Sequence, residues 1–307
     1  MPLLFRHDAI LAPLGSGSRG NCTYIGDDTR GVLVDCGLSA RQTLLRLEAA
    51  GLGAVRIEGV LVTHEHGDHV AAARVLSDRL ERRQGHTVPF FMTRGTAGAL
   101  RDRVRPKELI TIQSGRRFRV GSLEVEPFTV PHDTCDPVAY TVKVGDTVAA
   151  VVTDLGRSTR LVEQQLARCS LALIEFNHDL GMLMDGPYPW ALKQRVRGRH
   201  GHLSNAQAAE LVRRAATPRL EHLLLAHLSD DNNEPAVARE AAEAALHGAG
   251  LRGVTVTVAP QDRPADVRRA EVEVPQRARQ VAGPRRPRIA RGHRPPDDAS
   301  RQVSLFG

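Results

Sequence analysis

The sequence predicts an α/β protein whose mixed sheets are covered by helices, followed by a basic tail with no fold of its own. Short β-rich runs alternate with segments of helical apolar spacing along most of the chain. Several apolar runs end at a polar residue, as at 32–34 before Asp35 and at 60–62 before Thr63. Such alternation is typical of sheets flanked by helices, and 307 residues can bury a full core.

The expected elements follow one another in a mixed order. Strands at 32–34 and 60–62 precede a segment of helical spacing at 70–84. A strand-rich stretch comes next, with strands expected at 89–93, 118–120, 123–131, 138–144 and 148–154. Helices expected at 158–168, 204–216 and 234–247 then interleave with strands expected at 171–176, 223–226 and 254–258.

The apolar pattern ends after Ala259. Pro, Arg, Gly and Ala dominate residues 261–300, and a segment of this composition cannot bury enough apolar surface to fold. Residues 261–307 contain 11 Arg against 6 Asp or Glu, which is +5 of the formal net charge of +7. We therefore expect a nearly neutral catalytic domain at 1–260, a disordered basic Pro/Arg-rich linker at 261–300 and a terminal peptide at 301–307.

The cysteines and apolar runs also indicate a compartment. The four cysteines are scattered without a C-x-x-C pair, which is typical of a cytoplasmic protein with reduced thiols. No apolar run approaches the roughly 18 residues that suggest a membrane span. The first residues do not have the pattern of a signal peptide. We expect a soluble, cytoplasmic protein with no membrane partner.

A dense group of possible metal ligands follows the strand expected at 60–62: His64, His66, Asp68 and His69. In extended backbone, side chains two residues apart point to the same side, so the first two imidazoles would converge. Imidazoles and carboxylates are the ligands of catalytic Zn, Mn and Fe sites. A single buried histidine is more often a hydrogen-bonded core residue, but this cluster favours a metal site. Glu65, between the first two histidines, is expected to face solvent.

The motif H-x-H-x-D-H after a strand resembles the signature of the metallo-β-lactamase-fold hydrolases, over about residues 11–260. Four polar residues at the ends of apolar runs match the other motifs of that family: Asp35, His132, Asp154 and His227. The resemblance implies a metallo-β-lactamase αββα sandwich, in which two mixed sheets are flanked by helices. Because this fold supports several hydrolytic activities, it does not by itself identify the substrate.

The resemblance also implies the cofactor, which is two divalent metal ions, Zn or Mn. One ion would be bound by His64, His66 and His132. The other would be bound by Asp68, His69 and His227, and Asp154 would bridge the two. A pair of ions about 3.5–4 Å apart activates hydroxide and stabilises the oxygens of an in-line displacement at phosphorus.

Three residues are expected to act in catalysis: Asp68, His202 and Asp35. Asp35 would orient metal ligands through hydrogen bonds, although a turn residue would have the same composition. His202 lies in a segment that resembles tRNase Z-type phosphodiesterases, whose histidine assists at the leaving oxygen, and imidazole is a suitable general acid near neutral pH. Alternatively, His202 only precedes the N-cap of a helix beginning near Ser204.

Segments at 14–21, 175–179 and 227–233 resemble the WalJ (YycJ) subgroup, which is associated with 5′-to-3′ exonuclease activity on single-stranded DNA. We therefore expect an exonuclease of repair or replication. The alternatives are an RNA-processing phosphodiesterase of the tRNase Z type and a thioester or lactone hydrolase. The expected substrate-binding residues lie in these segments and in a basic loop at 188–199. They are Asn21, Asn177, His178, Lys193, Arg195 and Arg197. The alternative for the basic loop is that it is only a solvated loop.

The chain ends in Gln302-Val303-Ser304-Leu305-Phe306-Gly307. This pattern resembles the short peptide by which bacterial replication and repair proteins bind the sliding clamp. Leu305 and Phe306 would fill an apolar pocket, Gln302 would hydrogen-bond beside it, and the linker would provide reach. The alternative is an inert apolar terminus.

Overall fold

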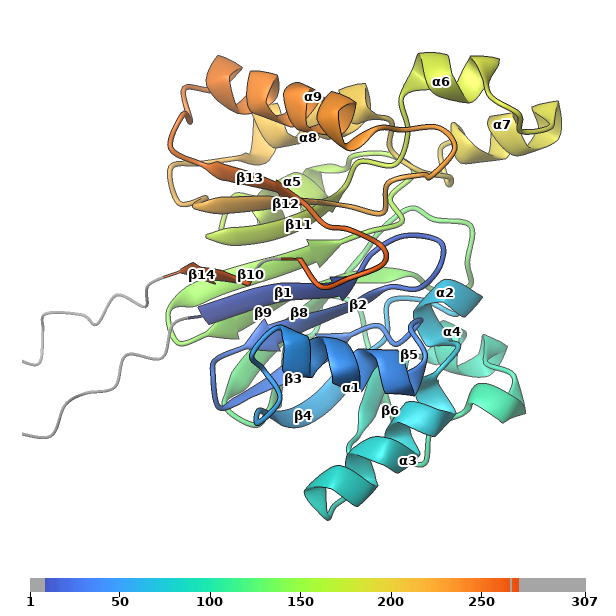
Figure 1. Ribbon diagram of the computed structural model, residues 1–307, viewed down its shortest axis with the longest axis vertical. Helices are drawn as coiled ribbons and strands as arrows, with labels where there is room; N and C mark the ends of the chain where they lie inside the picture. The colour runs from blue at the N-terminus through green and yellow to red at the C-terminus, as the bar shows by residue number, and fades with distance from the viewer. Residues whose placement is uncertain (1–8, 266, 271–307) are drawn as a thin grey trace, which may run out of the picture. The chain divides into compact units, whose positions relative to one another are not determined.

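In the computed structural model, residues 9–265 and 267–270 are described, and they build two seven-stranded sheets. The first sheet has the order β14 (Arg268–Ala270), β1 (Ala9–Gly15), β2 (Cys22–Gly26), β3 (Arg30–Val34), β4 (Arg56–Leu61), β5 (Phe90–Thr93), β6 (Leu109–Ile112). The second has the order β13 (Thr255–Val258), β12 (His222–Ala226), β11 (Leu171–Glu175), β10 (Thr147–Val152), β9 (Val138–Val144), β8 (Leu123–Thr129), β7 (Phe118–Val120). Figure 1 shows the two sheets stacked as neighbouring layers.

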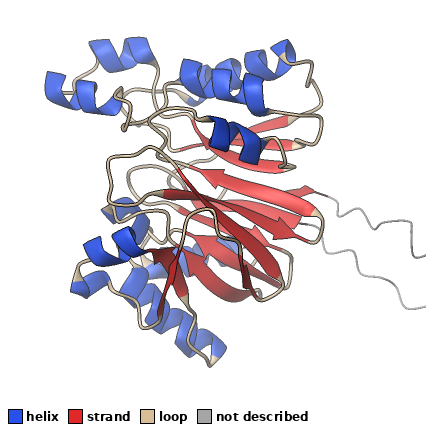
Figure 2. Cartoon of the chain, turned by 180° about the vertical axis from the view of Figure 1, so that it is seen from behind, coloured by secondary structure: helices blue, strands red, loops and turns tan. Residues whose placement is uncertain are grey.

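Helices cover the outer face of each sheet (Figure 2). Those on the first sheet are α1 (Ala40–Ala49), α2 (Gly67–Val70), α3 (Ala73–Gln84), α4 (Arg94–Ala99) and the short η1 (Asp102–Val104). Those on the second are α5 (Arg160–Leu166), α6 (Leu180–Asp185), α7 (Trp190–Val196), α8 (Asn205–Ala215) and α9 (Pro235–Gly248). The expected architecture, with two mixed sheets flanked by helices, is confirmed.

Three apolar clusters hold these layers together. One joins the first sheet to α1 and α3, a second joins the second sheet to α5, α8 and α9, and a third lies between the sheets. The alternation of side chains along β1 distributes them between two clusters, since Ile10 packs toward the helices and Leu11 toward the other sheet. β1 is therefore buried along its whole length, which explains why it reads as a continuous apolar run.

The strands that lead to the polar motifs run parallel. β3 to β6 are parallel in the first sheet, and β10 to β13 are parallel in the second. The carboxyl ends of parallel strands meet at one edge, so residues that follow them in sequence lie close together. Three such residues adopt left-handed backbone: Asp35 (φ 64°), Asp154 (φ 56°) and His227 (φ 56°). This conformation turns each chain sharply at the strand end.

Several sequence expectations need correction. The helix expected at 70–84 is confirmed as α3, although it begins at Ala73 because the separate short helix α2 ends at Val70. The basic segment at 188–199 contains helix α7 instead of being a loop throughout. The fold also continues past the boundary expected at residue 260. β14 pairs with β1, and Ala265 donates its N–H to the carbonyl of Pro13 (2.9 Å). Most of the linker expected at 261–300, and the peptide at 301–307, lie outside the described residues.

Among the described residues, no helix combines the length and the apolar character needed to cross a membrane.

We predict that a chain ending at residue 260 is less stable to unfolding than one ending at residue 273. The shorter chain loses the pairing of β14 with β1, and Arg46 loses its hydrogen bonds to the carbonyls of Gln261 and Asp262 (2.9 Å each). At about 1 kcal/mol for each hydrogen bond, the free energy of unfolding should fall by about 2–4 kcal/mol. Urea denaturation of the two chains measures the difference, and equal midpoints would contradict the assignment of β14 to the domain.

Candidate metal centre

The ligand-bearing segment after β4 has a tightly constrained backbone. His66 is the N-cap of α2, so Asp68 and His69 lie in its single turn. The carbonyl of Asp68 accepts the N–H of Asn21 (2.8 Å), and that of His69 accepts the N–H of Cys36 (2.7 Å). A side chain at Gly37 would place its Cβ 1.5 Å from the Asp68 carbonyl oxygen, so only glycine permits this approach. The loops that follow β1, β3 and β4 are thereby held to one another.

Three imidazoles form the first ligand group. His64 Nε2 lies 3.1 Å from His66 Nδ1, and His132 Nε2 lies 3.3 Å from the same atom. One ring nitrogen from each of these three residues lies within 4.8 Å of the other two. His64 and His66 follow a strand of the first sheet, whereas His132 follows β8 of the second.

The second group contains Asp68, His69 and His227, whose donor atoms also lie within 4.8 Å of one another. Asp68 Oδ2 lies 3.3 Å from His69 Nε2 and 3.5 Å from His227 Nε2. Two of its members follow β4 and the third follows β12. Like the first group, it therefore draws ligands from both sheets.

Asp154 lies between the groups. Its Oδ2 is 3.2 Å from His69 Nε2, and its Oδ1 is 3.8 Å from the Nε2 atoms of both His132 and His227. The side chain is buried, and Oδ2 accepts no hydrogen bond within the described residues. Burial raises the pKa of this carboxyl. The positive charges of His227 and His69 act in the opposite direction, and the resulting pKa lies well below the usual range. An ionised, buried oxygen without a hydrogen-bond donor is what a bridging position for cations requires.

Asp35 holds the ligands from behind. Its Oδ2 lies 2.8 Å from His69 Nδ1, and its Oδ1 accepts the N–H of Thr63 (2.8 Å). The Thr63 hydroxyl contacts the same carboxylate and lies 2.9 Å from His64 Nδ1. These contacts occupy the Nδ1 atoms of both histidines and leave their Nε2 atoms for a metal ion, the arrangement that carboxylates behind metal-bound histidines provide in general.

Glu175, which was not among the expected site residues, supports the other side. It is fully buried at the end of β11, with Oε1 2.7 Å from His202 Nδ1 and 3.2 Å from His227 Nδ1. Its Oε2 accepts the N–H groups of Leu155 and Leu203 (3.0 Å each). Burial raises the pKa of Glu175, but His202 and His227 together lower it to about 2. In the sequence, Glu175 could have been found as a carboxylate at the end of an apolar strand, the same position that other site residues occupy.

His202 stands beside the cluster, with its ring centroid 5.3 Å from those of His132 and His227. Its side chain keeps 21% exposure and lines a cavity of about 190 Å³ together with His66, Asp68 and Asp154. Burial lowers its pKa, but the carboxylates of Glu175 and Asp154 together raise it above the ordinary value for histidine. Because Nδ1 faces Glu175, Nε2 is the nitrogen available to a bound molecule.

Comparison with known proteins identifies the family. A model described as the beta-lactamase superfamily domain matches residues 30–227. The chain belongs to this superfamily. It is 33% identical over 243 residues to exodeoxyribonuclease YycJ of Bacillus anthracis, which covers 78% of this chain and 89% of the relative. It is 31% identical over 225 residues to exodeoxyribonuclease WalJ of Streptococcus pneumoniae, covering 72% and 81% of the two chains.

The solved structure of the metallo-β-lactamase fold protein YhfI from Bacillus subtilis is also similar, with a TM-score of 0.61 and 16% identity over 84% of this chain and 99% of that one. The fold prediction and the family resemblance are thus confirmed, and this member of the superfamily is a metallo-β-lactamase-fold hydrolase. The family and the histidine and aspartate cluster indicate that it binds divalent metal. The cluster fits such ions, since its donors are imidazole and carboxylate groups.

The residues expected to contact substrate have different positions in this hydrolase. Arg195 lines the cavity, with its Nε 2.6 Å from Asp133 Oδ2. Lys193 is buried and donates to the carbonyl of Met184 (2.6 Å). Arg197 is exposed and lies beside the sulfur of Met184 (3.7 Å). Of these three basic residues, Arg195 alone borders the cavity, because its neighbours face away on the short helix α7.

The other three residues expected to contact substrate, Asn21, Asn177 and His178, are buried and do not line the cavity. Asn177 donates to the carbonyl of His227 (2.9 Å), and His178 is enclosed so that burial lowers its pKa to about 4. Asn21 Nδ2 lies 3.0 Å from His69 Nε2. Asn21 and Asn177 therefore contact ligand residues, His69 and His227, whereas His178 contacts Asn177. Glu65, expected to face solvent, instead accepts the N–H of Cys135 (2.8 Å).

We predict that Asp35→Asn weakens metal binding by about 10- to 100-fold, because the His69 imidazole loses its carboxylate partner. Asparagine tolerates left-handed backbone, so the fold should be retained. Asp35→Ala should weaken binding similarly and add roughly 1–2 kcal/mol of backbone strain. Competition with a chromogenic zinc chelator measures affinity, and thermal melting measures stability. Unchanged affinity in Asp35→Asn would mean that Asp35 is only a turn residue.

Proposed function

We propose that the hydrolase is a metal-dependent nuclease, a 5′-to-3′ exonuclease on single-stranded DNA that acts in repair or replication. The observation that carries this proposal is the complete set of ligands for two ions beside a partly exposed histidine, in a chain that matches 89% of the length of a relative named exodeoxyribonuclease. Two ions can stabilise the attacking and leaving oxygens of an in-line displacement at phosphorus, and a proton donor can protonate the leaving oxygen.

In this proposal, His64, His66 and His132 hold one divalent ion and Asp68, His69 and His227 hold the other, with Asp154 between them. When bound, the ions supply the Lewis acidity that activates water and withdraws charge from the phosphate oxygens. Asp35 and Glu175 fix the orientation of the histidines behind the ligands. Arg195, at the edge of the cavity, is placed to meet a phosphate of the incoming strand.

His202 would deliver the proton to the leaving oxygen. Glu175 holds Nδ1 of this imidazole and raises its pKa, so the ring carries a proton that Nε2 can donate into the cavity. As the phosphorus–oxygen bond to the departing nucleotide breaks, that proton passes to the oxygen. The neutral imidazole that remains regains a proton from solvent through the cavity mouth.

We predict that the purified enzyme, supplied with Mn²⁺ or Zn²⁺, shortens 3′-labelled single-stranded DNA stepwise from its 5′ end. Removal of metal with EDTA should abolish the activity, as should the double change His66→Ala/Asp68→Ala, which removes one ligand from each group. Labelled RNA and duplex DNA run in parallel test the preference. Cleavage of a thioester with all three nucleic acids left intact would overturn the nuclease proposal.

We also predict that His202→Gln lowers kcat on DNA by at least about 100-fold, the range expected for loss of a general acid. Hydrolysis of bis-p-nitrophenyl phosphate should fall by less than about tenfold, because p-nitrophenolate departs without being protonated. Steady-state kinetics on both substrates distinguish the roles. An equal loss on both would assign His202 to positioning of the site and not to proton transfer.

The peptide at 301–307 belongs to the same proposal as a ligand of the bacterial sliding clamp. A synthetic peptide of this sequence should bind a bacterial clamp saturably, and replacement of Leu305 and Phe306 by Ala should abolish that binding. Equal binding by the two peptides would eliminate this partner.

A further inference from the structure

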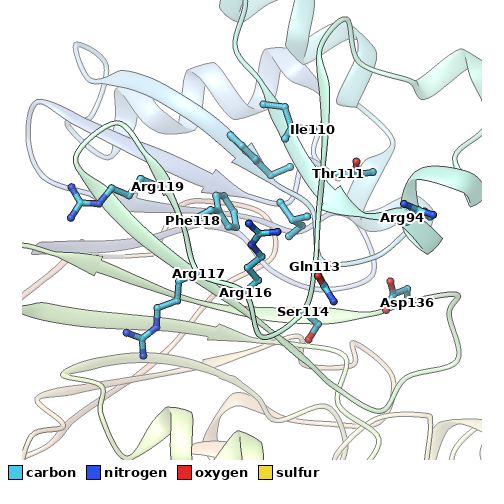
Figure 3. Close-up of a pocket in the computed structure, with 12 residues that line it drawn as sticks. Arg94, Ile110, Thr111, Gln113, Ser114, Arg116, Arg117, Phe118, Arg119 and Asp136 are labelled. Carbon is cyan, nitrogen blue, oxygen red and sulfur yellow. The ribbon is translucent and has the colours of Figure 1, made fainter.

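A second and larger cavity, of about 870 Å³, lies where the chain crosses from one sheet to the other (Figure 3). β6 is the last strand of the first sheet and β7 the last strand of the second, and residues 113–117 connect them. The lining residues come from these strands, from their connection, from β5 and the start of α4, and from the loop between β8 and β9. We call this cavity the β6–β7 groove. It has more than four times the volume of the space beside the metal ligands, about 190 Å³.

The groove is strongly basic. The residues that line it include one carboxylate, Asp136, and four arginines, which are Arg94, Arg116, Arg117 and Arg119. Arg117 is neutralised by Glu126 (2.8 Å) and Glu124 (3.5 Å). The side chains of the other three make no hydrogen bond or ion pair with any residue in the described part of the chain. Three unpaired guanidinium groups around one concave surface repel each other and attract a ligand with several negative charges.

Apolar side chains lie among these cations. Phe118, between Arg117 and Arg119 in β7, is half-buried and stacks on Phe91, with ring centroids 5.1 Å apart. Ile110 in β6 is 39% exposed. A surface that offers guanidinium groups together with aromatic and aliphatic side chains suits a single nucleic-acid strand, which presents phosphates and unpaired base faces at once. A duplex presents phosphates, but its bases are stacked inside.

One loop joins the groove to the metal centre. At its start, His132 belongs to the first ligand group and Asp133 borders the metal cavity, and Asp136, near its end, lines the groove. Thr93 donates its hydroxyl to the carbonyl of Asp136 (2.8 Å), which fixes this loop to the end of β5. Figure 3 shows Arg94 near Asp136 at one end of the groove and Arg119 at the other. The end with Asp136 therefore leads toward the ligands.

We propose that the β6–β7 groove binds the sugar-phosphate backbone of a single-stranded nucleic acid, several nucleotides away from the bond that is cleaved. Phosphates would pair with Arg94, Arg116 and Arg119, and bases would lie against Phe118 and Ile110. The inference rests on the proposed nuclease function and adds to it a site for the distant part of the substrate. Such a site holds the strand between successive cleavages and makes the enzyme prefer long substrates to short ones.

The test is the double change Arg116→Gln/Arg119→Gln in the full-length chain. Binding of a fluorescent single-stranded 30-mer in metal-free buffer, followed by anisotropy, should weaken by about tenfold at 0.1 M salt. The slope of log affinity against log salt should become shallower by about 1.4, since two phosphate contacts at roughly 0.7 each are lost. With metal present, the ratio of kcat/KM for the 30-mer to that for a dinucleotide should fall by about tenfold.

The matched control is Arg239→Gln/Arg252→Gln, which removes the same charge from helix α9 and from the connection between α9 and β13. β13 is the edge strand of the second sheet opposite β7. It should leave the salt slope and the substrate ratio unchanged, and melting temperatures should show that both variants are folded. Equal behaviour of the two variants would overturn the groove as a binding site. So would concentration-dependent self-association that only the groove variant loses, because the groove would then be an interface between two copies.

Failure of the nuclease function has a different signature. A wild-type enzyme that cleaves no nucleic acid with any metal, yet binds the 30-mer through Arg116 and Arg119 with the predicted salt slope, would overturn the function and retain the groove. A wild-type enzyme that cleaves the 30-mer and the dinucleotide in the same ratio as the groove variant would retain the function and overturn the groove. Equal competition by duplex DNA would show that the bases do not contribute and would overturn the preference for a single strand.

Discussion

Left-handed backbone at the ends of three strands is the constraint on which the metal centre depends. Asp35, Asp154 and His227 each turn the chain at a carboxyl edge, in a conformation that costs roughly 1–2 kcal/mol for a residue with a side chain. The surrounding contacts compensate, since Asp35 bonds Thr63 and His227 donates its N–H to the hydroxyl of Ser16 (2.7 Å). The strands thus supply rigidity, and the turns direct the side chains inward.

The interior between the sheets determines how accurately the two halves of the site meet. Tyr140, buried in β9 of the second sheet, donates its hydroxyl to the carbonyl of Val62 at the end of β4 (2.8 Å). Val138 donates its N–H to the carbonyl of Thr63 (3.1 Å). These bonds join the sheets two residues and one residue before His64, so that a small shift between layers would move a metal ligand.

Much of this centre could be predicted from the sequence because each ligand follows an apolar strand. The carboxyl ends of parallel strands meet at one edge of a sheet, so residues that follow such strands are expected to lie close together in space. Glu175 lies in the segment at 175–179 that resembles the WalJ (YycJ) subgroup, but a single carboxylate at a strand end does not by itself indicate a site residue. β14 is three residues long and rich in arginine, so only its pairing with β1 identifies it as a strand. The β6–β7 groove could not be predicted, because separate segments at 91–94, 110–119 and 136 form it.

Each ligand group takes members from both sheets, and this division affects the protein during its synthesis. His64, His66, Asp68 and His69 leave the ribosome early, but neither group is complete until His132 and His227 have followed and the second sheet has packed against the first. A nascent or half-folded chain therefore holds only fragments of the centre. A hydrolase built this way therefore acquires its complete ligand groups only as a finished domain.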